Sequence, residues 1–151
     1  MLTGDAMTDP SHCLKQAAAL AVHGGRVCLV TSSSGRRWIL PKGMIEPGQT
    51  EAEAAVSEAW EEAGVAGEVL REPLGIYRTT KWGQACVVVV YGIAVGEAAE
   101  RWPEADRRQR CWVSPKRAAA RLDIPALQEI LRSAFAEGGA FYQELATDEH
   151  R

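Results

Sequence analysis

The sequence predicts one α+β domain, on three observations. The chain has 151 residues, the usual size of a single domain, and 46% of them are hydrophobic while 25% are charged, as in globular proteins. Short apolar runs separated by turn residues predict strands along most of the chain. One capped helix interrupts these strands, and two amphipathic helices follow them. We expect the domain to span residues 15–138, with loose tails at 1–14 and 139–151.

The strands are expected where apolar runs end at turn residues. Gly24-Gly25 separates two such runs and predicts a hairpin. The run at Trp38 ends before Pro41, which disfavours helix in the residue that precedes it, and a loop is expected from Pro41 to Gly48. The expected strands are residues 17–23, 26–31, 38–40, 69–78, 85–95 and 111–113.

Three helices are expected. The first opens at a capping box, in which the hydroxyl of Thr50 and the carboxylate of Glu53 each satisfy a backbone N–H, and Gly64 supplies its left-handed end. The other two helices are expected at residues 115–122 and 125–136. The last one has an apolar face made of Ile124, Leu127, Ile130, Leu131 and Ala134.

Charge and composition exclude several classes of partner. The net charge is −3 and the pI about 5.7, so no overall basic field attracts nucleic acid, which is not expected as a partner. No apolar run approaches the roughly 20 residues that span a bilayer, so no membrane is expected either. Four scattered cysteines without a C-x-x-C pair predict free thiols in a reducing cytoplasm. Nothing in the sequence indicates an oligomeric state.

The chemistry is expected on the first helix. At about 100° per residue, Glu58, Glu61 and Glu62 fall within about a 100° sector beside a stripe of alanines, so they should border a cleft. Residues 43–70 contain seven glutamates and no Lys or Arg, so the balancing positive charge must come from elsewhere. Clustered carboxylates suit Mg²⁺ or Mn²⁺. The alternative is a solvated acidic helix face.

The same segment resembles the signature box of the Nudix hydrolases. Gly43 is followed after five residues by Gln49, and after seven more by the run Ser-Glu-Ala-Trp-Glu-Glu-Ala-Gly-Val at residues 57–65. All but two of the defined positions match, including the acidic triplet and both glycines. The first Glu of the pattern is Gln49 here, and its Arg is Ser57; in the family these two side chains pair. Losing both leaves no unpaired charge, so we interpret the change as altered loop support with the metal ligands intact.

The resemblance implies an α/β/α sandwich with a mixed sheet and a hydrolase that uses Mg²⁺ or Mn²⁺ to cleave phosphoanhydride bonds. By position, Glu58 and Glu62 match side-chain metal ligands, and Glu61 matches either a metal ligand or the base that activates water. Family members differ over which acid is the base, so Glu58 and Glu61 are both catalytic candidates. The backbone carbonyl of Lys42 or Gly43 would add a ligand.

Cations near the acidic helix are the candidates to bind the phosphates that are not cleaved, and Arg suits bidentate contacts with them. The alternative for each is a solvated surface charge. The candidates are Arg36, Arg37, Lys42, Arg78, Lys81, Arg107, Arg108 and Arg110.

Three segments, residues 33–38, 58–65 and 107–112, look like those of diphosphoinositol polyphosphate and diadenosine polyphosphate phosphohydrolases, within a looser likeness over residues 17–133. The expected substrate is therefore small and phosphorylated: nucleoside-diphosphate-linked, a dinucleoside polyphosphate or a diphosphoinositol polyphosphate. Two alternatives stay open. One is an RNA 5′-end pyrophosphohydrolase, which the acidic pI does not favour. The other is a non-catalytic module of the same fold that binds a nucleotide, which a turnover assay would distinguish.

Overall fold

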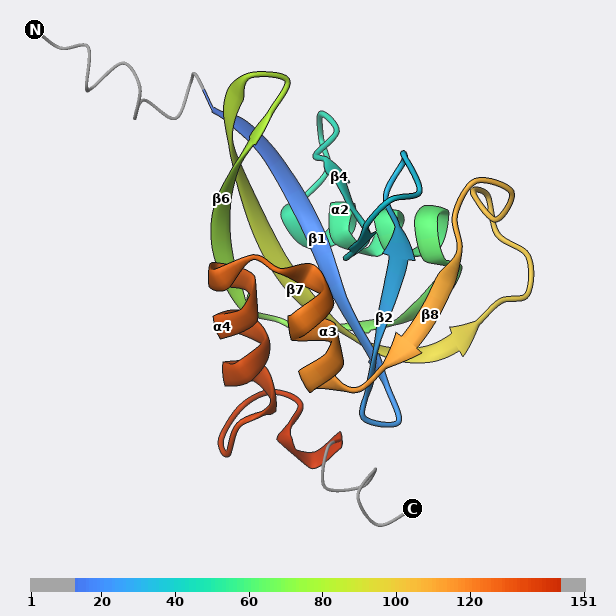
Figure 1. Ribbon diagram of the computed structural model, residues 1–151, viewed down its shortest axis with the longest axis vertical. Coiled ribbons are helices and arrows are strands. Elements are labelled where there is room, and N and C mark those ends of the chain that lie inside the picture. Colours follow the sequence, from blue (N-terminus) through green and yellow to red (C-terminus); the bar gives the residue numbers. More distant parts are fainter. Residues whose placement is uncertain (1–12, 145–151) are drawn as a thin grey trace, which may run out of the picture.

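A mixed sheet lies between helices on its two faces (Figure 1). The computed structural model describes residues 13–144. The strands are β1 (Leu14–His23), β2 (Arg26–Thr31), β3 (Trp38–Ile39), β4 (Lys42–Met44), β5 (Val65–Val69), β6 (Gly75–Lys81), β7 (Gln84–Ala98) and β8 (Arg110–Val113). The helices are α2 (Glu51–Glu58), the π-helix η2 (Ala59–Ala63), α3 (Pro115–Leu122) and α4 (Pro125–Phe135).

The long strands β1 and β7 run parallel at the centre of the sheet, in register from Leu14 with Cys86 to Val22 with Ala94. The other pairings are antiparallel: β2 and β4 pair with β1, β5 and β6 pair with β7, and β3 and β8 pair with β2. The predicted hairpin is confirmed, since Gly24 and Gly25 adopt positive φ between β1 and β2. The sheet is mixed, as expected.

Alternating residues of the central strand divide the core into two layers, because successive side chains of a strand point to opposite faces. Ala18, Leu20 and Val22 pack with α3 and α4. Ala17, Ala19 and Ala21 pack with α2 and η2, which contribute Ala54, Ala55, Ala59 and Ala63. Small side chains on both surfaces let this helix approach the sheet closely. The α/β/α sandwich is therefore confirmed.

Two segments of the sheet were predicted wrongly. The segment 69–78 is not one strand, because the chain leaves β5 at Val69 and enters β6 at Gly75, with Pro73 in the connection. The segment 41–48 is not all loop, because Lys42–Met44 forms β4 and pairs with β1. The sequence of β5, Val-Ala-Gly-Glu-Val, lacks the alternation that identifies a strand, and β4 has only three residues.

The first helix begins and ends as predicted. The backbone N–H of Glu53 donates to Oγ1 of Thr50 at 3.0 Å, Oε1 of Glu53 accepts from the backbone N–H of Thr50 at 2.8 Å, and Gly64 has φ 67°. Its last turn, however, is π-helical, so the angular positions expected for an α-helix do not hold beyond Glu58.

The C-terminal helices follow their predicted ranges, with α3 at 115–122 and α4 ending one residue early, at Phe135. Beyond the expected domain end at 138, Phe141 is buried and its ring centroid lies 5.7 Å from that of Phe135. The domain limits 15–138 and the two tails stay predictions, and residues 1–12 and 145–151 lie outside the described part. None of the described helices combines the length and apolarity needed to cross a membrane.

Candidate active site

One cleft of about 410 Å³ brings together acidic and basic side chains from distant parts of the chain. Its walls come from β1, the loop after β2, β3, β4, the end of α2 with η2, the end of β6 with the turn after it, and the loop before β8. Its acidic residues are Glu58 and Glu62, and its basic residues are Arg37, Lys42, Lys81 and Arg108.

Glu62 is the buried acid of this cleft, with 5% of its surface exposed. Its Oε1 accepts a hydrogen bond from the backbone N–H of Lys42 at 3.2 Å, and its Oε2 lies 3.3 Å from a guanidinium nitrogen of Arg108. Burial raises the pKa of Glu62 above its ordinary value, Arg108 opposes this rise, and Glu58 adds to it. Burial thus disfavours the ionised form of this carboxylate, and a further positive charge beside it would stabilise that form.

Glu58 is half-buried beside it. Burial raises the pKa of Glu58, a hydrogen bond with Glu62 opposes the rise, and the charge of Glu61 adds to it. The carboxylate lies against Gly43, where an added Cβ atom would be only 2.7 Å from Oε1 of Glu58. Glycine in β4 therefore leaves the space that this carboxylate occupies.

Glu61 is placed differently from its two neighbours. It is exposed and is not among the residues that line the cleft. Within residues 13–144, no three His, Cys, Asp or Glu side chains converge as a metal-binding group. The structure therefore brings together two of the three predicted acidic ligands, and the roles of Glu61 and of the Lys42 or Gly43 carbonyl stay predictions.

The donor set still fits a hard divalent cation. Two adjacent carboxylates, both partly removed from water, face one cleft, and like charges in this arrangement need a counter-charge. All of their donor atoms are oxygens, which suit Mg²⁺ and Mn²⁺ better than softer metals.

Besides Arg108, three of the predicted phosphate-binding cations line the cleft: Arg37, Lys42 and Lys81. The pKa of Lys42 is lowered, mainly by burial and next by the charge of Lys81, with a smaller effect of Arg37. Lys81 and Arg37 thus lie close enough for their positive charges to act on Lys42, and such a cluster of positive charge favours the binding of an anion.

The other predicted cations have different positions. Arg36 and Arg78 are exposed and do not line the cleft, and Arg107 is exposed with a guanidinium nitrogen 3.7 Å from Glu104. Arg108 is held by Glu104 at 2.8 Å and by the carbonyl of Thr31 at 2.8 Å as well as by Glu62. Arg110 donates to the carbonyl of Ala63 at 2.8 Å. Arg108 and Arg110 therefore support the acidic helix, and only Arg108 also reaches the cleft.

Sequence reasoning missed Trp102. Its Nε1–H donates to the carbonyl of Glu62 at 2.9 Å, its ring lies 4.4 Å from the guanidinium of Arg110, and a Cβ atom at Gly64 would approach it to 2.8 Å. It thus fixes the end of the π-helix. Trp102 lies in a charged loop without periodicity, so no local pattern could have identified it.

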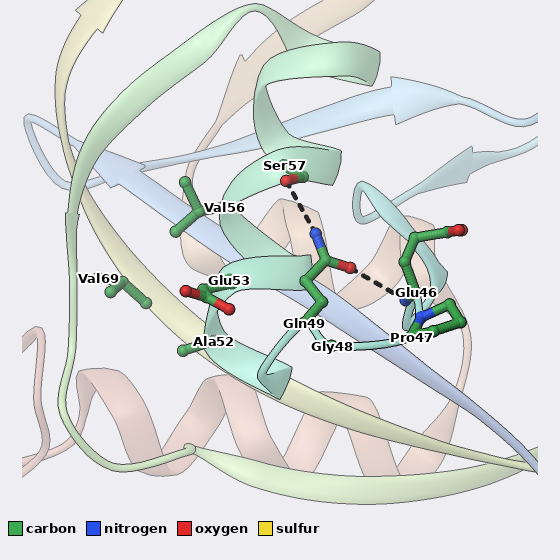
Figure 2. A pocket seen from close by; sticks show the side chains of 9 residues that line it. All are labelled: Glu46, Pro47, Gly48, Gln49, Ala52, Glu53, Val56, Ser57 and Val69. Carbon is green, nitrogen blue, oxygen red and sulfur yellow. Dashed lines mark hydrogen bonds between the residues drawn. The ribbon is translucent and has the colours of Figure 1, made fainter.

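The two departures from the signature contact each other. The side-chain amide of Gln49 donates to Oγ of Ser57 at 3.2 Å, and its Oε1 accepts from the backbone N–H of Glu46 at 3.0 Å (Figure 2). Both residues line a hollow of about 610 Å³ beside α2, and Val56 and Val69 also line it. A neutral hydrogen bond therefore stands where the family pattern has a charged pair.

Comparison with known proteins supports the resemblance to the Nudix hydrolases. The NUDIX domain model matches residues 14–134. The chain is 41% identical over 91 residues to Nudix hydrolase 4 of Arabidopsis thaliana, covering 59% of this chain and 44% of that protein. It is 37% identical over 110 residues to diphosphoinositol polyphosphate phosphohydrolase 3-beta of Homo sapiens, covering 69% and 66%. The chain thus spans between about half and two thirds of the length of these relatives.

Among solved structures, the chain is similar in fold to a C. elegans Ap4A hydrolase binary complex, with a TM-score of 0.66 and 22% identity over 83% of this chain and 98% of that one. The match of the domain model extends over most of the chain. The chain therefore belongs to the Nudix hydrolase family.

Proposed function

We propose that this protein hydrolyses a phosphoanhydride bond in a small substrate that carries several phosphates, with Mg²⁺ or Mn²⁺ as cofactor. The observation that carries the proposal is the cleft that Glu58 and Glu62 line together with Arg37, Lys42 and Lys81. A cation between the acids and the substrate, and basic side chains beyond it, would together match the charge of a polyphosphate. The names of two similar proteins, a diphosphoinositol polyphosphate phosphohydrolase and an Ap4A hydrolase, support these two substrate classes.

In the proposed mechanism, Glu58 and Glu62 hold the cation, with the carbonyl of Lys42 or Gly43 as a further ligand. When bound, the cation supplies positive charge to the phosphate oxygens and makes water more acidic. Arg37, Lys42 and Lys81 bind the phosphates that are not cleaved and orient the bond for attack. A carboxylate accepts the proton of the attacking water. The position of Glu58 in the cleft favours it for this step over the exposed Glu61.

The test is a substrate panel of diadenosine polyphosphates, inositol pyrophosphates, ADP-ribose, nucleoside triphosphates and 5′-triphosphorylated RNA, with Mg²⁺, Mn²⁺ or a chelator. We expect metal-dependent turnover of at least one small polyphosphate. Preferred turnover of the RNA would favour the RNA 5′-end alternative. Ligand-induced thermal stabilisation without phosphate release by any substrate would favour the non-catalytic binding module.

We further propose a reducing compartment, the cytoplasm, for this activity. Cys13, Cys28, Cys86 and Cys111 are all free thiols, which supports this compartment over an oxidising one.

A further inference from the structure

Gln16 is a buried polar residue in the mostly apolar strand β1, with 2% of its surface exposed. It pairs with Met44 of β4, and Ala18, on the same face of β1, pairs with Lys42. Gln16 and Lys42 are therefore diagonal neighbours, a separation that long side chains can bridge. Both residues line the cleft that contains Glu58 and Glu62.

The side-chain oxygen of Gln16 is shared by two donors. Oε1 accepts from Nζ of Lys42 at 3.3 Å and from Sγ of Cys86 at 3.6 Å, which uses both of its lone pairs. Burying an amide is costly unless it is hydrogen-bonded, so an apolar side chain would serve better here if packing were the only requirement. The contact with Lys42 is the one that reaches the cleft.

Lys42 has a flexible four-carbon stem, and its ammonium needs a partner to keep one position. Among residues 13–144 it forms no salt bridge. Arg37 and Lys81, which line the same cleft, would repel it. The Gln16 amide is thus the group that holds the ammonium, and because it is neutral it leaves the positive charge of Lys42 available.

We propose that Gln16 is a positioning residue, which holds the Lys42 ammonium in the cleft ready to bind a phosphate of the substrate. This inference rests on the proposed function, because it concerns the same phosphates. An ammonium held in place loses less freedom on binding than a mobile one, so the substrate binds more tightly. A glutamate at position 16 would instead form an ion pair with Lys42 and compete with the phosphate.

Binding of inorganic tripolyphosphate in metal-free buffer, measured by isothermal titration calorimetry, tests the inference without requiring hydrolysis. We expect Gln16→Met, which keeps the side-chain volume, to raise Kd about fivefold, as the loss of one hydrogen bond does. Lys42→Met should raise Kd about tenfold or more. The double variant should bind no more weakly than Lys42→Met, within a factor of about two, because the amide acts only through Lys42.

Two further variants separate positioning from packing. Cys86→Ala removes the other donor to the same oxygen and should leave Kd within about twofold of wild type. Gln16→Glu should weaken binding about tenfold. This variant tests the positioning role if Gln16→Met does not fold. On a substrate that wild type hydrolyses, Gln16→Met should raise KM more than it lowers kcat, whereas a purely structural role would lower the active fraction and leave KM unchanged.

The inference is overturned if wild type does not bind tripolyphosphate, if Gln16→Met or Gln16→Glu binds it as wild type does, or if the effects of Gln16→Met and Lys42→Met multiply in the double variant. Failure of the proposed function would look different. The protein would then hydrolyse nothing in the panel, while the tripolyphosphate pattern of the variants could still be measured.

Discussion

The side-chain amide of Gln49 donates a hydrogen bond to the hydroxyl of Ser57, 3.2 Å away, at the two positions where the chain departs from the Nudix signature. The same amide also accepts from the backbone of Glu46, so it joins the loop before α2 to the helix itself. The altered pair is therefore a loop support, as interpreted from the sequence.

This contact predicts coupling between the two positions. Gln49→Glu together with Ser57→Arg should fold and retain activity, because the two charges replace one hydrogen bond by an ion pair. Each single variant should be less stable than the double variant. A lone Glu at position 49 would add to the negative charge of Glu46 and Glu53, and a lone Arg at position 57 would lie near Glu58. Chemical denaturation of the four proteins should give a coupling free energy of about 0.5–3 kcal/mol. Additive effects would mean that the two side chains do not interact in solution.

Gly43→Ala should lower kcat/KM while the protein stays folded. The added methyl group would occupy the space of the Glu58 carboxylate, which is the flexible end of a side chain and can move aside. We expect kcat/KM to fall at least tenfold, equivalent to about 1.4 kcal/mol, with the folded circular dichroism spectrum preserved. Gly96→Ala is the matched control, because it lies in β7 with no atom within 4 Å of its added Cβ. Equal kinetics of the two variants would argue against a role for the Glu58 position.

Arg37 and Arg36 are adjacent in sequence but differ in position, which makes them a matched pair. Arg37 lines the cleft and Arg36 does not. We expect Arg37→Ala to raise KM about fivefold for a substrate with five phosphates, and less for one with two, because an exposed guanidinium contributes modestly. Arg36→Ala should change neither KM. If the two variants behave alike in steady-state assays of both substrates, the cleft does not bind the polyphosphate as proposed.

Cys28 should be the least reactive thiol. Burial raises the pKa of Cys28 to about 12, so at pH 8 only about one molecule in ten thousand carries the nucleophilic thiolate in the folded state. Cys13 and Cys111 are half-buried and should be alkylated first. Peptide mapping by mass spectrometry after timed alkylation at pH 8 would measure this order. Early labelling of Cys28 in the folded protein would contradict the buried position.

Local signals in the sequence predicted much of the fold. The glycines between β1 and β2, the Thr50–Glu53 capping box and Gly64 each specify backbone geometry within a few residues, and all three were identified correctly. The short strands β4 and β5 were missed because their pairing with the long strands, and not their own composition, makes them strands.

The site was predictable in part. The spacing of Glu58 and Glu62 identified two acids that the fold does bring together in the cleft. The exposed position of Glu61 could not be predicted, because Glu61 lies within a π-helical turn. The carbonyls of Glu62 and Ala63 in this turn accept hydrogen bonds from Trp102 and Arg110, which lie 40 and 47 residues later in the sequence. Pairing of Lys42 with Gln16 likewise depends on strand register, which the sequence does not reveal.

The most direct test of the central claim, that Glu58 and Glu62 hold the metal, is to measure Mn²⁺ binding and turnover at limiting Mg²⁺ for Glu62→Gln. The exposed Glu68→Gln serves as a control for loss of one negative charge. We expect Glu62→Gln to keep its fold in metal-free buffer, because a neutral side chain is less costly to bury, while Mn²⁺ binding weakens at least tenfold and most turnover is lost. Glu68→Gln should match wild type in both assays. Wild-type Mn²⁺ affinity and turnover in Glu62→Gln would contradict the account.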